Sequence, residues 1–200
     1  MADGITISVA VEGLVDEAVA RRLIVFAGAT PGPVYGKQGK PFLRERIAGY
    51  NNAAQHSCWM VLVDLDRDHD CAPPLRAAWL PQFAPRLCFR VAVRAVEAWL
   101  LADPERIAKF LAVAPGKVPS APETLDDPKS AMVALARATR RREVREDMVP
   151  RDGSGRSVGP AYASRLIEFA TSCWRPEVAA QRAESLRRAI DCLQCLAKTP

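Results

Sequence analysis

Residues 58–66 read Cys-Trp-Met-Val-Leu-Val-Asp-Leu-Asp, and this stretch decides the fold that we expect. Six apolar residues without alternation are typical of a strand buried on both faces, as in a parallel sheet. Asp64 and Asp66 then lie at the carboxyl end of that strand, where α/β sheets bind their ligands. Two carboxylates held so close repel each other unless a cation compensates them. Oxygen ligands favour Mg²⁺, Mn²⁺ or Ca²⁺ over zinc, so the stretch predicts a metal site of that kind.

The residues on either side alternate between strand and helix patterns. Further strands are expected over residues 5–11 and 87–93. Helices are expected over residues 16–26, with Asp16 as N-cap, over 42–54 and 73–83, and from 95 with a break near 103–104. Residues 28–41 are rich in Gly and Pro and read as a loop with a short strand near 34–35. Such alternation predicts an α/β fold with a mostly parallel sheet flanked by helices.

The alternation ends near residue 113. Residues 114–127 are rich in proline, and helical patterns follow over 128–146, 160–173 and 176–197, with a Gly- and Arg-rich linker at 150–160. We therefore expect two parts, an α/β core over residues 1–113 and a helical C-terminal extension over 114–200 that packs on the core.

Composition narrows the class of protein. The chain of 200 residues is 49% hydrophobic and carries a formal net charge of +5, which favours a polyanionic partner such as nucleic acid. It has no apolar run long enough to span a membrane, and Met1 to Gly4 do not begin a secretory signal, so we expect a cytoplasmic protein. Its six cysteines are then expected as reduced thiols, with Cys192 and Cys195 packed in the core. Two histidines are too few for His-based acid–base chemistry or a His-ligated zinc site, and no P-loop motif is present.

Glu12 ends the first expected strand and precedes Gly13, which permits a close approach of the backbone to a ligand. If the first strand lies beside the 58–63 strand, Glu12 converges with Asp64 and Asp66 at one edge of the sheet. Three carboxylates can hold one or two Mg²⁺ ions, which polarise a phosphoryl oxygen and activate a water. The alternative for Glu12 is a solvated carboxylate at a strand end.

Two more acidic positions are candidates. Asp68 continues an alternating run of aspartates that resembles the start of an EF-hand loop. Such a loop needs Gly at its sixth position and Glu at its twelfth, where this chain has His69 and Leu75, so the motif does not match. Asp68 is therefore an optional metal ligand. Glu97 follows the 87–93 strand and could face the same crevice, or it could pair with Arg94 on a helix surface.

Basic residues gather in the C-terminal part. Lys129 begins the first helix of the extension and could offset charge in a transition state, although a solvated lysine is the more ordinary role. Arg140, Arg141, Arg142 and Arg145 form the densest cluster, which is either a solvated helix end or a nucleic-acid patch. Arg151 and Arg156 stand in the flexible linker, where they could contact a phosphate backbone.

Taken in order, these motifs resemble the TOPRIM domain of topoisomerases, primases and overcoming-lysogenization-defect nucleases. The resemblance rests on Val11-Glu-Gly13 with Asp16-Glu17, on Val63-Asp-Leu-Asp66 and on Val96-Glu-Ala-Trp-Leu-Leu101, and it covers about residues 5–110. It is closest to small stand-alone bacterial TOPRIM-like proteins, which are often encoded beside an ATPase in defence-type gene clusters. It implies that Asp64 and Asp66 are Mg²⁺ ligands and that Glu12 is a metal-binding or acid–base glutamate. Glu97 and Lys129 correspond to an acidic residue and a lysine of the nuclease branch.

The function expected from these residues is Mg²⁺- or Mn²⁺-dependent phosphodiester cleavage of nucleic acid. The resemblance adds an ATPase as a candidate protein partner, and a homodimer is a further assembly that the chain could form. One alternative is a non-catalytic subunit that binds nucleic acid or a partner. A second alternative is a metal-dependent phosphatase or nucleotide-processing enzyme.

Overall fold

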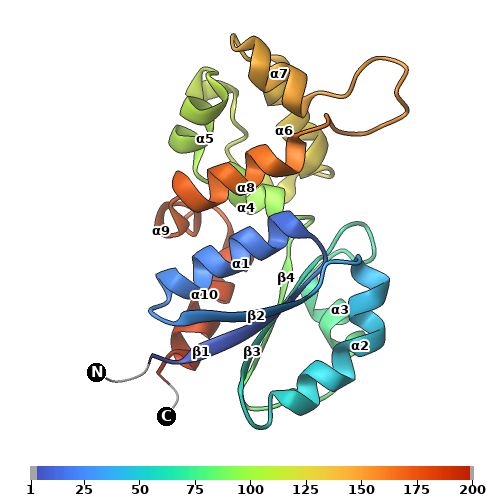
Figure 1. Cartoon of the computed structure of the whole chain (residues 1–200), viewed down its shortest axis with the longest axis vertical. Helices are drawn as coiled ribbons and strands as arrows, with labels where there is room; N and C mark the ends of the chain where they lie inside the picture. Colours follow the sequence, from blue (N-terminus) through green and yellow to red (C-terminus); the bar gives the residue numbers. More distant parts are fainter. Residues whose placement is uncertain (1–3, 199–200) are drawn as a thin grey trace.

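The computed structural model describes residues 4–198. The expectation that Met1 to Gly4 do not begin a secretory signal falls mostly on residues 1–3, which lie outside the described part. Four parallel strands form the sheet in the order β2-β1-β3-β4 (Figure 1). The strands are β1 (Thr6–Val11), β2 (Thr30–Gly36), β3 (Cys58–Asp64) and β4 (Leu87–Ala92). The helices of this part are α1 (Leu14–Phe26), α2 (Lys40–Ala53) and α3 (Ala72–Trp79).

Helices cover both faces of the sheet, which is why its central strands are apolar throughout. On one face Met60 and Leu62 of β3 pack in a core that includes Leu23 of α1. On the other face Val61 and Val63 pack with residues of α2 and α3, such as Leu43 and Leu75. Burial on both sides explains the unbroken apolar run, since alternate residues of a strand point to opposite faces.

The C-terminal part is helical, as expected, and it returns to the sheet. Helices α4 (Val96–Leu101) and α5 (Pro104–Leu111) still belong to the 1–113 part. The helices of the extension are α6 (Pro128–Arg137), α7 (Arg142–Met148), α8 (Tyr162–Ser172), α9 (Pro176–Ala179) and α10 (Glu184–Leu196), with short 3₁₀ turns at Pro115–Lys117 and Pro122–Thr124. Helix α8 packs on α1, α6 packs on α4, and α10 packs on β4 (Figure 1). The core on this face runs without a break from β1 to α10.

A buried ion pair fastens the start of α5 to the start of α9. Asp103 is fully buried, and the guanidinium of Arg175 binds both of its carboxylate oxygens at 2.7 and 2.9 Å. Asp103 also caps α5 by accepting from the backbone N–H of Arg106 at 3.3 Å. This cap and Pro104 account for the helix break that the sequence predicts at residues 103–104.

The predicted fold class is confirmed: the chain is α/β, with an all-parallel sheet flanked by helices and a helical C-terminal extension, an arrangement consistent with a TOPRIM-like fold. Several boundaries differ from expectation. Strand β2 takes up much of the expected 28–41 loop. Asp16 is not the N-cap of α1, because the helix begins after Gly13 and Asp16 lies in its first turn.

Two expected helices are each divided. The 128–146 helix breaks between α6 and α7, where the buried hydroxyl of Thr139 donates to the carbonyl of Leu111. The 176–197 helix breaks before α10, whose first N–H groups are bound by the carboxylate of Glu123 at 2.8 Å (Glu184) and 3.1 Å (Ser185). Both breaks depend on contacts distant in sequence. Within residues 4–198 no helix has the length and apolar character needed to cross a membrane.

Candidate functional site

Four acidic side chains meet at the carboxyl edge of the sheet. Glu12 follows β1, Asp64 ends β3, Asp16 lies in the first turn of α1 and Glu97 lies in the first turn of α4. The parallel register aligns the ends of β1 and β3, and it pairs Asp64 with Ala92 of β4. The fold therefore brings residues from four different elements to one place, as expected for strand ends in an α/β protein.

Backbone hydrogen bonds fix the two carboxylates at the strand ends. The Asp64 N–H donates to Oε1 of Glu12 at 2.9 Å. Oδ1 of Asp64 in turn accepts from the N–H of Val96 at 3.0 Å, at the start of α4. These bonds engage one oxygen of each carboxylate and hold both side chains at the sheet edge.

Glu97 belongs to this cluster and not to the helix surface. Its side chain is buried, and its Oε1 accepts a hydrogen bond from the Tyr162 hydroxyl at 3.2 Å. The ammonium of Lys129 lies 3.9 Å from the same oxygen, and the Lys129 side chain is half-exposed. Arg94 instead donates to the carbonyls of Asp66 and His69, so the alternative that Glu97 pairs with Arg94 is wrong.

Asp16 is the fourth carboxylate, with only 7% of its surface exposed. Its Oδ1 is buried and has no hydrogen-bond partner among residues 4–198. Gly13 gives it room: a Cβ at position 13 would lie 3.1 Å from Oδ2 of Asp16. A buried carboxylate oxygen without a partner is costly, so Oδ1 of Asp16 lacks a compensating group.

The pKa values of these carboxyl groups also show that burial and mutual repulsion oppose their ionisation. Burial raises the pKa of Glu12 from its ordinary 4.5 to about 7, although the hydrogen bond from Asp64 and the charge of Lys40 oppose the rise. Burial and then the charge of Glu97 raise the pKa of Asp16 to about 6. Burial, followed by the charges of Asp16 and Glu97, holds the pKa of Asp64 well above its usual range. Carboxylates that oppose one another's ionisation are typical of sites that need a cation.

Asp66 and Asp68 lie at the exposed rim of this cluster. Lys40, at the start of α2, binds Oδ2 of Asp66 at 2.7 Å and Oδ2 of Asp68 at 2.8 Å. Asp66 has a left-handed backbone, with φ of 51°, and its N–H donates to the carbonyl of Arg94 at 2.8 Å. The negative charge of Asp66 also contributes to the raised pKa values of Glu12 and Asp64. These contacts hold the loop after β3 beside the cluster, with the Lys40 ammonium as the counter-ion of Asp66 and Asp68.

The donor set fits a hard divalent cation. Within residues 4–198 no three His, Cys, Asp or Glu side chains are already arranged as a complete metal-ligand group. The donors are nevertheless all oxygen, Asp16 has an unpartnered buried oxygen, and Lys40 places positive charge beside Glu12, Asp66 and Asp68. Carboxylate oxygens are the donors that Mg²⁺ and Mn²⁺ prefer.

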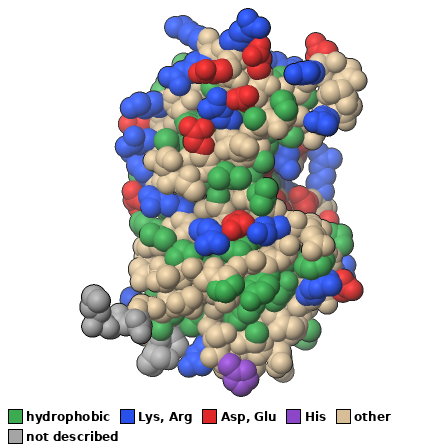
Figure 2. Space-filling model, viewed as in Figure 1, with side chains coloured by type: hydrophobic (Ala, Val, Ile, Leu, Met, Phe, Trp, Pro, Cys, Tyr) green, Lys and Arg blue, Asp and Glu red, His purple; other side chains and the backbone are tan. Residues whose placement is uncertain are grey.

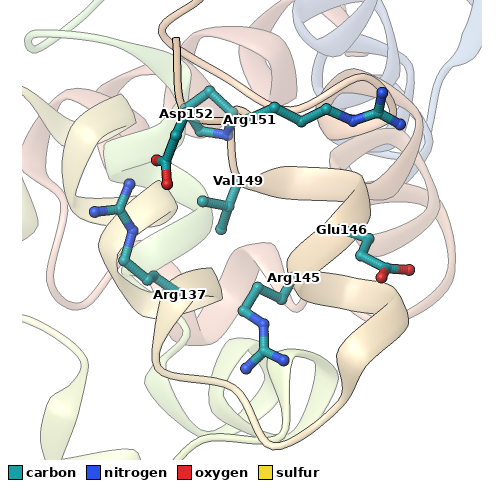
Figure 3. Close-up of a pocket in the computed structure, with 7 residues that line it drawn as sticks. Arg137, Arg145, Glu146, Val149, Arg151 and Asp152 are labelled. Atoms are coloured by element: carbon teal, nitrogen blue, oxygen red, sulfur yellow. The ribbon is translucent and has the colours of Figure 1, made fainter. Parts of the chain in front are cut away.

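Two cavities with arginines in their walls border α6. A cavity of about 510 Å³ is lined by Ser130, the residue after Lys129, and by Arg137 at the other end of the helix. A second cavity of about 580 Å³ shares Arg137 and Pro150 in its walls and adds Arg145 and Arg151. Figure 3 shows Arg137 and Asp152 reaching toward one another across this second cavity, while Arg151 points away. Figure 2 shows Lys and Arg side chains, with acidic ones among them, over the end of the molecule where α7 lies.

The structure brings Glu12, Asp64 and Glu97 together at the sheet edge, with Lys129 beside Glu97. Asp66 and Asp68 lie at the rim of this cluster, paired with Lys40. The sequence argument missed Asp16 and Tyr162 as members of the site. Asp16 had a signal, since the first turn of a helix that directly follows a strand faces the sheet edge. Tyr162 had none, because it enters from α8 through the tertiary packing.

No family model, curated protein or solved structure matches this chain.

Proposed function

We propose that this protein is a Mg²⁺- or Mn²⁺-dependent nuclease of the TOPRIM type, which hydrolyses phosphodiester bonds in nucleic acid. The observation that carries the proposal is the convergence of Glu12, Asp16, Asp64 and Glu97 at one sheet edge, with Oδ1 of Asp16 unpartnered. The motif resemblance supports the same assignment. A site of mutually destabilised carboxylates gains stability when a cation binds it.

In this proposal Glu12, Asp64 and Asp66 hold the metal, and Asp68 is an additional ligand. A bound Mg²⁺ would polarise a phosphoryl oxygen and lower the pKa of a water. For Asp66 and Asp68 to reach a metal, the ammonium of Lys40 has to move away from them. Asp16 adds negative charge from the side of α1.

The remaining groups act on protons and charge. Glu12, with a pKa near 7, can take up or release a proton at neutral pH, as a general acid or base does. Lys129, half-exposed beside Glu97, can offset negative charge that develops on a phosphate. Tyr162 fixes Glu97 through its hydroxyl and thereby positions it.

The cavities along α6 support a polymeric substrate. Arg137, Arg145 and Arg151 line them, and Lys129 lies on the same helix as Arg137. Seven residues of helix separate Ser130 from Arg137, which is about 10 Å. Such cavities could hold a phosphate backbone, while a phosphatase for small molecules has no need of them. An ATPase partner, a role in bacterial defence and a cytoplasmic location rest on the resemblance or on composition, and they remain part of the proposal.

One observation favours a rival function. Lys40 already neutralises Asp66 and Asp68, so the acidic loop could serve a non-catalytic subunit as a contact surface for nucleic acid or a partner protein. In that case the protein would bind its partner without a divalent cation.

A cleavage assay decides between these functions. Supercoiled plasmid, single-stranded DNA, RNA and a small phosphomonoester would be incubated with the protein in Mg²⁺, in Mn²⁺ and in EDTA. Asp64→Asn and Glu12→Gln keep the hydrogen-bond acceptors that the Val96 and Asp64 N–H groups use, and they remove the charge. Asp70→Asn, an exposed aspartate of the same loop, is the matched control.

We expect the wild type and Asp70→Asn to cleave a polynucleotide only with metal, and the two site variants to lose about 100-fold or more in rate. Circular dichroism would show that all variants are folded. Full activity in Asp64→Asn, or activity in EDTA, would contradict the proposal. Hydrolysis of the phosphomonoester alone would favour a phosphatase, and binding without any cleavage would favour the rival.

A further inference from the structure

A second group of reactive side chains lies away from the acidic site, at the edge strand β4. Cys88 of β4 is fully buried in the hydrophobic core against which Cys192 of α10 packs, and the two side chains interact. Cys192 is only partly buried. The sequence suggested that Cys192 and Cys195 both pack in the core, but Cys195 is exposed, so that part of the expectation is wrong. The thiol partner of Cys192 lies on a different element, more than a hundred residues earlier.

Two arginines surround this thiol pair. Arg90 lies two residues beyond Cys88, so both side chains are on the same face of β4, and the guanidinium of Arg90 interacts with both thiol groups. Arg76, from α3, adds a second positive charge near Cys192. The hydrogen bond from Cys88 and the charge of Arg90 lower the pKa of Cys192 from 9.0 to about 6, while burial raises the pKa of Cys88. These shifts favour the thiolate form of Cys192 and the protonated thiol of Cys88.

A cavity of about 220 Å³ lies beside the two arginines. Its walls include Arg76 and Arg90, and Arg188, which stands one helical turn before Cys192 on α10. The Nε atoms of Arg76 and Arg90 are buried without a hydrogen-bond partner in the described part of the chain. The cavity is large enough for hydrogen peroxide or a small alkyl hydroperoxide, and its unpartnered N–H groups can hydrogen-bond the peroxide oxygens.

We propose that Cys192 and Cys88 form a redox pair that a hydroperoxide oxidises to a disulfide between α10 and β4. The Cys192 thiolate attacks the terminal oxygen of the hydroperoxide and the O–O bond breaks. The other oxygen leaves as hydroxide or alkoxide and takes a proton from solvent to become water or an alcohol. Cys192 is then a sulfenic acid. The sulfur of Cys88 attacks it, forming the S–S bond, and the proton of Cys88 leaves with the hydroxide as water. The two sulfur atoms together lose two electrons when the disulfide forms, and the hydroperoxide gains these two electrons.

A Cys88–Cys192 disulfide would restrain α10, which contacts the elements that hold the acidic site. Helix α10 also carries Ser185, whose hydroxyl oxygen accepts hydrogen bonds from the N–H of Val93 at 3.2 Å and from Nε1 of Trp99 at 2.7 Å. Val93 directly follows β4, and Trp99 lies in α4 two residues after Glu97. The redox pair itself does not depend on the nuclease proposal, and its test does not use nuclease activity.

The test is peptide mapping by mass spectrometry after treatment of the reduced protein with one equivalent of hydrogen peroxide. We expect a Cys88–Cys192 disulfide in the wild type. In Cys88→Ala we expect a sulfenic acid at Cys192 that dimedone traps, and in Cys192→Ala we expect Cys88 to stay reduced. Cys71→Ala is the control, because Cys71 is exposed and lines the same cavity but is not part of the pair.

A second measurement needs no cysteine variant. In the wild type at pH 7, iodoacetamide should alkylate Cys192 about tenfold faster than the exposed Cys71, because most of Cys192 is thiolate. Arg90→Leu should reduce this advantage, because it removes one of the groups that lower the pKa of Cys192. Oxidation at Cys71 with Cys88 and Cys192 still reduced would overturn the proposal, as would alkylation of Cys192 no faster than that of Cys71.

Discussion

The raised pKa of Glu12 makes the stability of the metal-free protein depend on pH. The carboxyl group binds its proton more tightly in the folded chain, with a pKa of about 7, than in the unfolded chain, with 4.5. The free energy of unfolding must therefore fall as pH rises through this window. Between pH 5 and pH 8 the Glu12 contribution amounts to about 2.5 kcal/mol. Asp16, whose pKa is raised to about 6, adds to the same trend.

The perturbation is Glu12→Gln, which keeps an oxygen for the Asp64 N–H and cannot ionise. Urea unfolding in EDTA would be measured at pH 5 and at pH 8 for the wild type, Glu12→Gln and the exposed control Asp70→Asn. We expect the wild type and the control to lose stability over this range and Glu12→Gln to lose about 2.5 kcal/mol less. Saturating Mg²⁺ at pH 8 should return the lost stability to the wild type. The same pH dependence in Glu12→Gln as in the wild type would refute the reasoning.

Three further predictions concern the parts around the site. Gly36→Ala should destabilise the fold by more than about 3 kcal/mol in urea unfolding, because φ is 87° and a Cβ would lie 2.3 Å from the Val11 carbonyl oxygen. Gly28→Ala, also at positive φ but in open space, should cost about 1 kcal/mol. Equal losses of stability in the two variants would contradict a steric clash at position 36. Lys129→Met should lower the rate of cleavage by about tenfold or more and leave the affinity for Mn²⁺ unchanged, whereas Lys129→Arg should retain part of the rate; loss of metal affinity would contradict its assigned role. Tyr162→Phe should cost about 1–3 kcal/mol of stability because it removes the hydroxyl donor of a buried carboxylate, and an unchanged urea midpoint would contradict this.

The fold was predictable because its signals are local. The apolar run at residues 58–63 identifies a strand buried on both faces, and the alternation of strands and helices predicts a parallel sheet. Strand β2 was largely missed because Gly32, Pro31 and Pro33 read as a loop. As an edge strand paired only with β1, it tolerates prolines that would break a central strand.

The site was predictable as far as it depends on strand ends. Glu12 and Asp64 follow directly from the positions where β1 and β3 end. Tyr162 could not be predicted, because it reaches Glu97 from a helix 65 residues later. The ion pairs of Lys40 with Asp66 and Asp68 also depend on tertiary packing, since they join the start of α2 to the loop after β3.

The most direct test of the cation site is calorimetric titration of the metal-free protein with Mn²⁺ at pH 7, in two buffers that differ in ionisation enthalpy. Mn²⁺ accepts oxygen ligands and binds them more tightly than Mg²⁺. The account predicts binding with release of protons in the wild type and in Asp70→Asn, because Glu12 is partly protonated at this pH, and loss of binding in Asp64→Asn. Absence of binding in the wild type, or equal affinity in Asp64→Asn, would contradict it.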